Sequence, residues 1–398
     1  MSLSRKQFLG LAVGQAIRLS KSAGEPPAPP ERLQIASVKA YPIKVPGVAG
    51  GPVPKFTSDF DPARSRWIGP FAQLGGAILV EIKTAQGLTG YGMGGGGAAA
   101  ATIIEQHLGP LITGANALNV ELLWDQMYNS TLFYGRKGVT IMAISGVDLA
   151  LWDIRGKHAR QPVYKLLGGP NRDKVPAYYT GFEVDKALEL GFRAFKHPIR
   201  HNLNDGREGM KKVIDELRAI RGKIGPDSQL MIDVLCQWDV PHTLEMAERM
   251  QEFRLYWIEE PLSPDNLEGY AQLCREVRGP LIASGEHEYT RFGFEELIGH
   301  KAVKLLQPDT TWSGGLTEVR RIAALAAAHN LPMAPHRGGS PYGLSVILTT
   351  PSCVLAESFG TLEKSTPLMT AMTSRFENGY YYPTEKPGFG VEISKSML

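Results

Sequence analysis

The stretch LYWIEEPLSPDNLEGYAQLCREVRGPLIASGE, residues 255–286, contains one complete unit of the predicted fold. An apolar strand that ends in two glutamates is followed by a helix pattern at residues 266–277, and a second apolar strand then ends at Glu286. A helix between two strands allows them to run parallel in one sheet. We therefore expect acidic side chains at the carboxyl ends of neighbouring parallel strands.

The same unit recurs on both sides of this stretch. Short apolar segments alternate with amphipathic helix patterns from residue 175 onward. The predicted strands are VPAYYTG, FRAFKH, LMIDV, LYWIEE, LIASGE, VKLLQPD, LPMAPH and VLAESF. Eight such units suit a closed (β/α)8 barrel, a modified TIM barrel of the α/β class, better than an open sheet.

Nearly every predicted strand ends on a polar residue. One such residue would need no explanation beyond a strand that meets water. Seven of them, five being carboxylates, indicate a site, because the carboxyl ends of the strands carry the active site in barrels of this type. The seven are Lys196, Asp233, Glu259, Glu286, Asp309, His336 and Glu357.

Three successive strands, the third to the fifth, end on Asp233, Glu259 and Glu286. Three carboxylates that converge on one point repel each other, and a bound hard cation removes that repulsion. Ligation by oxygen atoms alone favours Mg²⁺ over zinc or copper and leaves coordination positions open for substrate and water. These residues are therefore the predicted metal ligands.

The sixth and seventh strands end on Asp309 and His336, close enough for a hydrogen bond that fixes the imidazole tautomer. This arrangement predicts that His336 is a base that removes a proton next to a substrate carboxylate. Lys196 would stabilise the negative charge that develops, together with the metal ion. Glu357 would form a hydrogen bond at the substrate carboxylate.

Several classes of protein are disfavoured. With 43 basic and 40 acidic residues the formal net charge is +3, and no long basic run suggests a nucleic-acid partner. The three cysteines are widely separated, so neither a disulfide framework nor a thiolate zinc site is expected. No apolar stretch is long enough to span a membrane. The sequence GYGMGG, residues 90–95, satisfies GxGxxG but follows a predicted antiparallel hairpin, which disfavours a dinucleotide-binding domain.

Residues 1–32 are interpreted as a tail with a Pro-rich linker, EPPAPPE, outside the fold. The opening SRKQFL is similar to a twin-arginine export signal in which Lys6 replaces the second arginine. Its apolar run is short and no clean cleavage site follows. A cytoplasmic location is therefore expected, with export to the periplasm left open.

From about residue 33 to the end the sequence resembles the enolase superfamily, mandelate racemase subgroup. The motifs include AISGVDLALWDIRGK, WIEEPL, SGEHE, QPDTTWSGGLTEV and APHRGGSPYG. The resemblance implies an α+β capping domain at 33–165, a barrel at 166–372, a segment at 373–398 that returns to the capping domain, and a homo-oligomer. It also implies the same Mg²⁺ ligands, the Asp–His pair and Glu357.

Within that subgroup the sequence is most similar to L-rhamnonate dehydratases, for example in SGEHEYTRFGFEELI. The subgroup's usual Lys-x-Lys is Lys196-His197-Pro198 here, so the second lysine is missing, as in that family. His197 should point outward, because side chains alternate along a strand. The resemblance weakens at residues 45–75, where Arg64 and Arg66 are candidate substrate contacts, as is His287 of the SGEHE motif.

The expected activity is dehydration of an acid sugar, with L-rhamnonate or a similar compound favoured as the small-molecule substrate. A single histidine can remove the C2 proton and then protonate the departing C3 hydroxyl, whereas racemisation usually needs a group on each face of the substrate. Another acid-sugar dehydratase, a racemase or epimerase, and a metal-binding scaffold without turnover remain alternatives. Catalytic participation of His197 or His201 is also left open.

Overall fold

The computed structural model describes residues 32–43 and 76–397. The first elements are the strands of a three-stranded antiparallel sheet, in the order β1 (Ile35–Ile43), β2 (Ala77–Thr84) and β3 (Thr89–Gly95). The central strand, AILVEIKT, is buried at all but one of its residues. The predicted antiparallel hairpin is therefore present, with its turn at residues 85–88.

The glycines of β3 serve the packing of a helix. A Cβ atom on Gly92 would lie 2.1 Å from the carbonyl oxygen of Gly146, and one on Gly90 would lie 2.2 Å from that of Ala150. Both carbonyls belong to α5 (Val139–His158), which is buried along most of its length. Glycine is thus required at these positions because the backbone of the helix lies directly against the strand.

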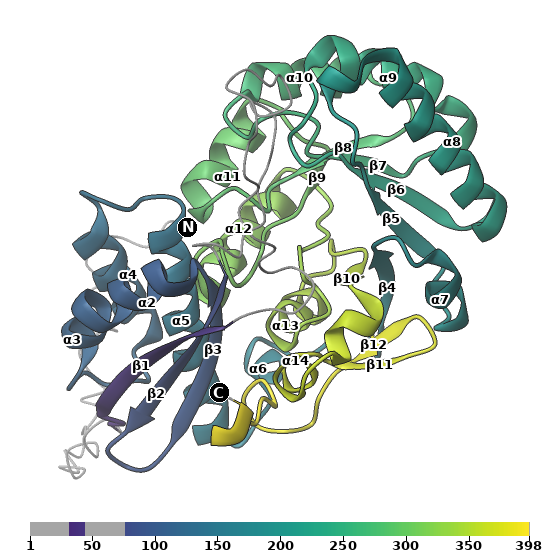
Figure 1. Ribbon diagram of the computed structural model, residues 1–398. Coiled ribbons are helices and arrows are strands. Elements are labelled where there is room, and N and C mark those ends of the chain that lie inside the picture. Colours follow the sequence, from purple (N-terminus) through teal and green to yellow (C-terminus); the bar gives the residue numbers. More distant parts are fainter. Residues whose placement is uncertain (1–31, 44–75, 398) are drawn as a thin grey trace, which may run out of the picture. The chain divides into compact units, whose positions relative to one another are not determined.

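The sheet is covered by helices that follow it in the sequence (Figure 1). The chain continues from β3 directly into these helices, and a π-helical turn at Ile104–Leu108 separates the first two. They are α2 (Gly97–Ile103), α3 (Gly109–Ile112), α4 (Val120–Thr131) and α5, after which the short α6 (Val163–Leu166) leads to the barrel.

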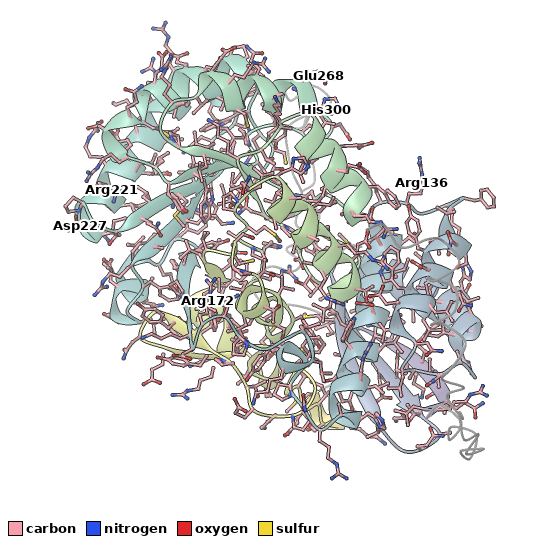
Figure 2. All side chains as sticks on the ribbon, turned by 180° about the vertical axis from the view of Figure 1, so that it is seen from behind. Arg136, Arg172, Arg221, Asp227, Glu268 and His300 are labelled. Atoms are coloured by element: carbon pink, nitrogen blue, oxygen red, sulfur yellow. The ribbon has the colours of Figure 1, made fainter. Side chains whose placement is uncertain are left out.

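The barrel strands pair in parallel in the order of the sequence, and the last of them, β10, pairs with the first, β4, so that the barrel is closed. They are β4 (Val175–Thr180), β5 (Ala194–Pro198), β6 (Gln229–Asp233), β7 (Trp257–Glu259), β8 (Leu281–Ser284), β9 (Leu305–Leu306) and β10 (Ala356–Ser358). Outside the strands, Arg172 (Figure 2) donates to the carbonyls of Pro351 and Cys353, at 3.2 and 2.8 Å, and ties the start of the barrel to its end.

The seventh predicted strand, LPMAPH, is reduced to a single bridging residue. Met333 pairs in parallel with Leu306 on one side and Cys353 on the other. Pro332 and Pro335 flank this bridge, and proline has no backbone N–H to donate to a neighbouring strand. The barrel is thus closed at this position, but without a continuous ladder.

Helices lie on the outer side of the strands (Figure 1). In α8 the buried residues Val213, Leu217, Ile220 and Ile224 recur with the spacing of one helix face, which packs against the barrel. The helices are α7 (Val184–Glu189), α8 (Gly206–Ile224), α9 (Val240–Arg249), α10 (Leu267–Glu276), α11 (Thr290–Gly299), α12 (Gly315–Ala328) and α13 (Pro341–Thr349).

After the barrel the chain forms α14 (Pro367–Ala371) and a hairpin of β11 (Arg375–Glu377) and β12 (Tyr380–Tyr382), of which β12 pairs with β4. The N–H of Phe389 then donates to Asp153 of α5 at 2.9 Å.

The domain boundaries at 165/166 and 372/373 stay predictions. Within residues 32–43 and 76–397, no helix combines the length and the apolar composition that a membrane span requires.

Helix α5 meets the barrel through Asp148, which is fully buried. Its carboxylate accepts hydrogen bonds from Thr317 of α12, at 2.5 Å from the hydroxyl and 3.0 Å from the backbone N–H. Burial raises the pKa of Asp148 to about 7, although the bonds from Thr317 oppose this change.

This burial predicts a pH effect on stability. Above about pH 4, the pKa of Asp148 in the unfolded chain, the unfolded chain binds fewer protons at this residue than the folded chain does. The free energy of unfolding therefore decreases as the pH rises toward 7. Asp148→Asn removes the titration. The free energy of unfolding of the variant, relative to that of the original chain, should therefore rise by roughly 2 kcal/mol between pH 5 and pH 7, measured by urea unfolding. A difference that does not change with pH would contradict this.

Candidate active site

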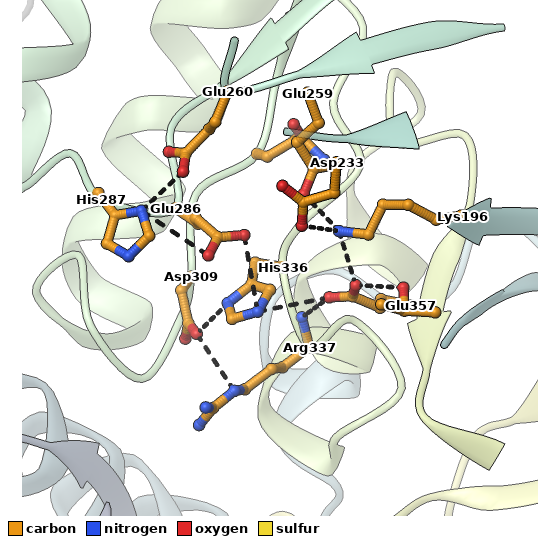
Figure 3. A network of polar contacts seen from close by, with 12 residues as sticks. Lys196, Asp233, Glu259, Glu260, Glu286, His287, Asp309, His336, Arg337 and Glu357 are labelled. Carbon is orange, nitrogen blue, oxygen red and sulfur yellow. Dashed lines mark hydrogen bonds and ion pairs between the residues drawn. The ribbon is translucent and has the colours of Figure 1, made fainter. Parts of the chain in front are cut away.

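The carboxyl ends of the barrel strands bring the seven predicted polar residues together (Figure 3). Asp233 and Glu259 are the last residues of β6 and β7, whereas Glu286 and Asp309 follow β8 and β9 by two and three residues. The barrel interior is filled one layer below by Tyr178, Ala194, Met231, Trp257, Ala283, Leu305, Ala334 and Leu355. This apolar layer forms the floor of the site.

Asp233, Glu259 and Glu286 form a buried acidic group, which we call the carboxylate triad. One oxygen from each lies within 4.8 Å of the others. Burial raises the pKa of all three carboxyls, and repulsion between neighbouring carboxylates adds to the increase. Three oxygen donors at this spacing, with such a cost for ionisation, fit a hard divalent cation such as Mg²⁺.

Lys196 lies beside the carboxylate triad and is itself buried. Its Nζ atom contacts Glu259 and lies 3.5 Å from Oδ2 of Asp233 and 2.9 Å from Oε1 of Glu357. Burial alone would lower the pKa of this lysine, but the surrounding carboxylates outweigh it and raise the pKa well above its usual value. The side chain is therefore a fixed positive charge at the edge of the site.

His336 and Asp309 form the expected hydrogen bond, with 2.7 Å between Nδ1 and Oδ2. The other carboxylate oxygen of Asp309 accepts bonds from the hydroxyl and backbone N–H of Thr311, both at 2.6 Å. The aspartate is thus held at both oxygens, and it orients the imidazole with Nδ1 toward itself.

The second ring nitrogen of His336 faces the centre of the site. Nε2 lies 3.7 Å from Glu286 and 3.6 Å from Glu357 (Figure 3). Burial disfavours the protonated ring, but the charges of Glu286 and Glu357 outweigh burial and raise the pKa of His336 to about 9. Nε2 is thus the ring atom available for exchange of a proton with a ligand.

Glu357 completes the site from β10. Its two oxygens accept hydrogen bonds from the Thr180 hydroxyl, at 2.6 Å, and from the backbone N–H of Arg337, at 2.8 Å. Burial would raise the pKa of Glu357, but Lys196 and His336 outweigh burial and lower it to about 2. This carboxyl group is therefore ionised, and its pKa is shifted in the opposite direction from those of the carboxylate triad.

Sequence reasoning missed two residues that hold Glu259. Trp257 Nε1 and Gln307 Nε2 donate to Oε2 of Glu259, at 2.9 and 2.6 Å. Each precedes a predicted site residue by two positions, Trp257 before Glu259 and Gln307 before Asp309. Side chains two apart along a strand share a face, so the period of the strand was the signal that could have identified them.

Other candidates take different positions. His287 lies at the site, with Nδ1 2.8 Å from Glu260 and 3.7 Å from Glu286. His197 points outward as predicted, and its Nε2 lies 3.0 Å from Glu216 of α8, on the outer side of the strand. Arg64 and Arg66, and the predicted N-terminal signal, lie outside the described residues.

The chain is similar to several known proteins. The chain is 39% identical over 329 residues to a Caldivirga maquilingensis protein named "Putative L-rhamnonate dehydratase", over 81% of this chain and 82% of that protein. The crystal structure of rhamnonate dehydratase from Gibberella zeae complexed with Mg is 32% identical, with a TM-score of 0.78, and covers 92% of this chain and 95% of that one.

A third similar structure is that of L-talarate dehydratase from Polaromonas sp. JS666, complexed with Mg and L-glucarate. It is 26% identical, has a TM-score of 0.75, and covers 92% of this chain and 96% of that one. Residues 73–168 match the mandelate racemase / muconate lactonizing enzyme N-terminal domain, and residues 182–397 match the enolase C-terminal domain-like family. The chain therefore belongs to the mandelate racemase subgroup of the enolase superfamily.

Proposed function

We propose that this protein is a Mg²⁺-dependent acid-sugar dehydratase, with L-rhamnonate or a closely related acid as its substrate. The observation that carries the proposal is the Asp309–His336 pair, whose free ring nitrogen faces the carboxylate triad. The similarity to rhamnonate and talarate dehydratases supports the substrate class.

Asp233, Glu259 and Glu286 would hold the metal ion through their oxygen atoms. When bound, the ion supplies positive charge that offsets the three carboxylates and stabilises the negative charge developing on the substrate carboxylate. Lys196 adds a second, permanent positive charge. The ionised Glu357, held by Thr180 and Arg337, accepts a hydrogen bond from the substrate.

His336 is the residue that accepts and donates the proton in the proposed reaction. The neutral form of its ring, which is the minor form near neutral pH in the metal-free site because the pKa is raised to about 9, accepts the C2 proton at Nε2. Asp309 at Nδ1 stabilises the imidazolium that results. The same Nε2 then donates that proton to the departing C3 hydroxyl, so that the C2–H and C3–O bonds break and water leaves. Tautomerisation of the enol product gives a 2-keto-3-deoxy acid.

Racemisation or epimerisation is the second candidate. It would use a second acid or base on the opposite face of the substrate, where many members of the subgroup carry a lysine. Pro198 occupies that position here and pairs with Asp233 in the β5–β6 register. Because a proline side chain cannot transfer a proton, this observation favours elimination.

A substrate screen tests the proposal. L-Rhamnonate and a panel of other acid sugars are incubated with the protein and Mg²⁺, and the 2-keto-3-deoxy product is assayed. We expect turnover of at least one acid sugar that EDTA abolishes and Mg²⁺ restores. Turnover of none of the panel, turnover that survives EDTA, or recovery of an epimer in place of a keto acid would each reject the proposed reaction.

The two hydrogen bonds to Glu259 give a further prediction. Trp257 and Gln307 donate to Oε2 of this carboxylate, while Lys196 contacts Oε1, so the two bonds fix the orientation in which Glu259 would meet the metal ion. Gln307→Ala should therefore weaken Mg²⁺ binding about 10- to 100-fold. The measurement is calorimetric titration of the metal-free protein. The matched control is Gln251→Ala, since this exposed glutamine lies outside the barrel. Equal Mg²⁺ affinities of the two variants would contradict the prediction.

A further inference from the structure

The three strand ends that supply the carboxylate triad also supply a second group of potential ligands. Each second side chain follows its triad residue by one or three positions, and the atoms of the new group lie within 4.8 Å of one another. The residues are Cys236 after β6, Glu260 after β7 and His287 after β8. We call them the sulfur-containing group.

Glu260 is at the centre of this group. Its Oε2 lies 2.8 Å from Nδ1 of His287 and 3.3 Å from Sγ of Cys236 (Figure 3 shows the first contact). The residue is only 1% exposed, and its other oxygen, Oε1, is buried and accepts no hydrogen bond from the described residues. A buried carboxylate oxygen without a partner destabilises the folded state, and a bound cation removes that cost.

The backbone is also arranged unusually here. Cys236 and Glu260 have φ angles of 59° and 41°, in the left-handed region that residues other than glycine seldom adopt. Such a conformation is unfavourable by itself and persists where the surroundings impose it. Two of the three side chains are thus directed into the group at an energetic cost.

The donor atoms identify the class of ligand. The carboxylate triad offers oxygen alone, whereas the sulfur-containing group offers a thiol, an imidazole and a carboxylate. Sulfur and nitrogen donors select zinc-type cations over Mg²⁺. We propose that Cys236, Glu260 and His287 form a second cation site, distinct from the carboxylate triad, that binds Zn²⁺ or Co²⁺ with three protein ligands and one open position.

The simpler interpretation is a hydrogen-bonded group in which Cys236 and His287 both donate to Glu260. That arrangement leaves Oε1 of Glu260 unexplained, whereas a cation could contact either carboxylate oxygen. The two interpretations also differ in their proton balance. A cation has to displace the protons on sulfur and on the ring nitrogen, so its affinity should increase with pH.

The test uses the purified full-length chain without a histidine tag, freed of metal, in a large excess of Mg²⁺. Co²⁺ is then titrated in. Cobalt bound to a thiolate gives a near-ultraviolet charge-transfer absorption, which the all-oxygen triad cannot produce. We expect this absorption in the original chain and in Cys274→Ser, a matched control for a thiol on α10. It should be absent from Cys236→Ser and should disappear when Zn²⁺ is added.

His287→Asn gives an independent arm, because this variant keeps the thiol. The Co²⁺ concentration at half-saturation should rise at least about tenfold. Absence of the absorption from the original chain would overturn the proposal, and so would its survival in Cys236→Ser. An unchanged midpoint in His287→Asn would do the same. None of these readouts depends on turnover, so the proposed dehydratase activity can fail while this site is confirmed, and the reverse.

Discussion

Replacing His336 by asparagine is expected to lower kcat on the acid-sugar substrate by about 10³-fold or more, because one nitrogen atom accepts and returns the proton in the proposed reaction. Nε2 is placed for this by the 2.7 Å bond between Nδ1 and Asp309. Asparagine can keep a bond to Asp309 but cannot accept a proton. Exchange of the C2 proton of the substrate with D₂O should be lost together with turnover.

Two measurements separate this effect from damage to the fold. The Mg²⁺ affinity of His336→Asn should remain within a few-fold of the original value, since His336 is not one of the proposed ligands. His300→Asn is the matched control, because His300 is exposed at the end of α11 (Figure 2). A His336→Asn variant that keeps most of the activity of the His300→Asn control would disprove the role of the imidazole.

Asp233→Asn is expected to have the second large effect, the loss of Mg²⁺-dependent stabilisation and of turnover. Ligand binding at a hundredfold excess over Kd stabilises a folded protein by about 2.7 kcal/mol. This stabilisation should disappear in the variant. The metal-free variant should instead melt at a higher temperature than the metal-free original, since one buried charge that repels Glu286 has been removed.

The prediction is specific because Asp233→Asn should raise the melting temperature of the metal-free protein and abolish the increase that Mg²⁺ causes. Thermal melts with and without Mg²⁺ measure both effects in one experiment. Asp227→Asn, at an exposed aspartate close to the start of β6 (Figure 2), should behave like the original chain in both conditions. If Asp233→Asn also kept its Mg²⁺-dependent shift in melting temperature, the carboxylate triad would not be the metal site.

The strand–helix pattern was sufficient to predict the barrel, because each strand is short, apolar and followed by an amphipathic helix. The rule that parallel strands end on one face then brought Asp233, Glu259 and Glu286 into one group. The strand predicted at LPMAPH is wrong in its extent, because Pro332 and Pro335 flank it and only a bridge at Met333 forms.

The hydrogen bonds that hold Glu259 and Glu357 in place could not be predicted from the sequence. Gln307 directly follows β9 and reaches Glu259 of β7 past the one strand between them, and Thr180 reaches Glu357 across the closing pair of strands. Such bonds depend on the register of strands far apart in the chain, which no local pattern specifies. The sulfur-containing group was missed for a related reason. Cys236 is isolated in the sequence, and no local pattern specifies the left-handed backbone conformation that accompanies its contact with Glu260.

The closure of the barrel has a consequence for the order in which the protein can be made. Thr180 and Glu357, which are hydrogen-bonded in the site, are separated by 177 residues of sequence. During synthesis on the ribosome, β4 therefore keeps an unpaired edge until β10 has emerged, and such edges are prone to aggregation. Lys196 meanwhile lacks one of its buried counter-ions. The group formed by Lys196, His336 and Glu357 is thus complete only when the last strand of the barrel has been translated.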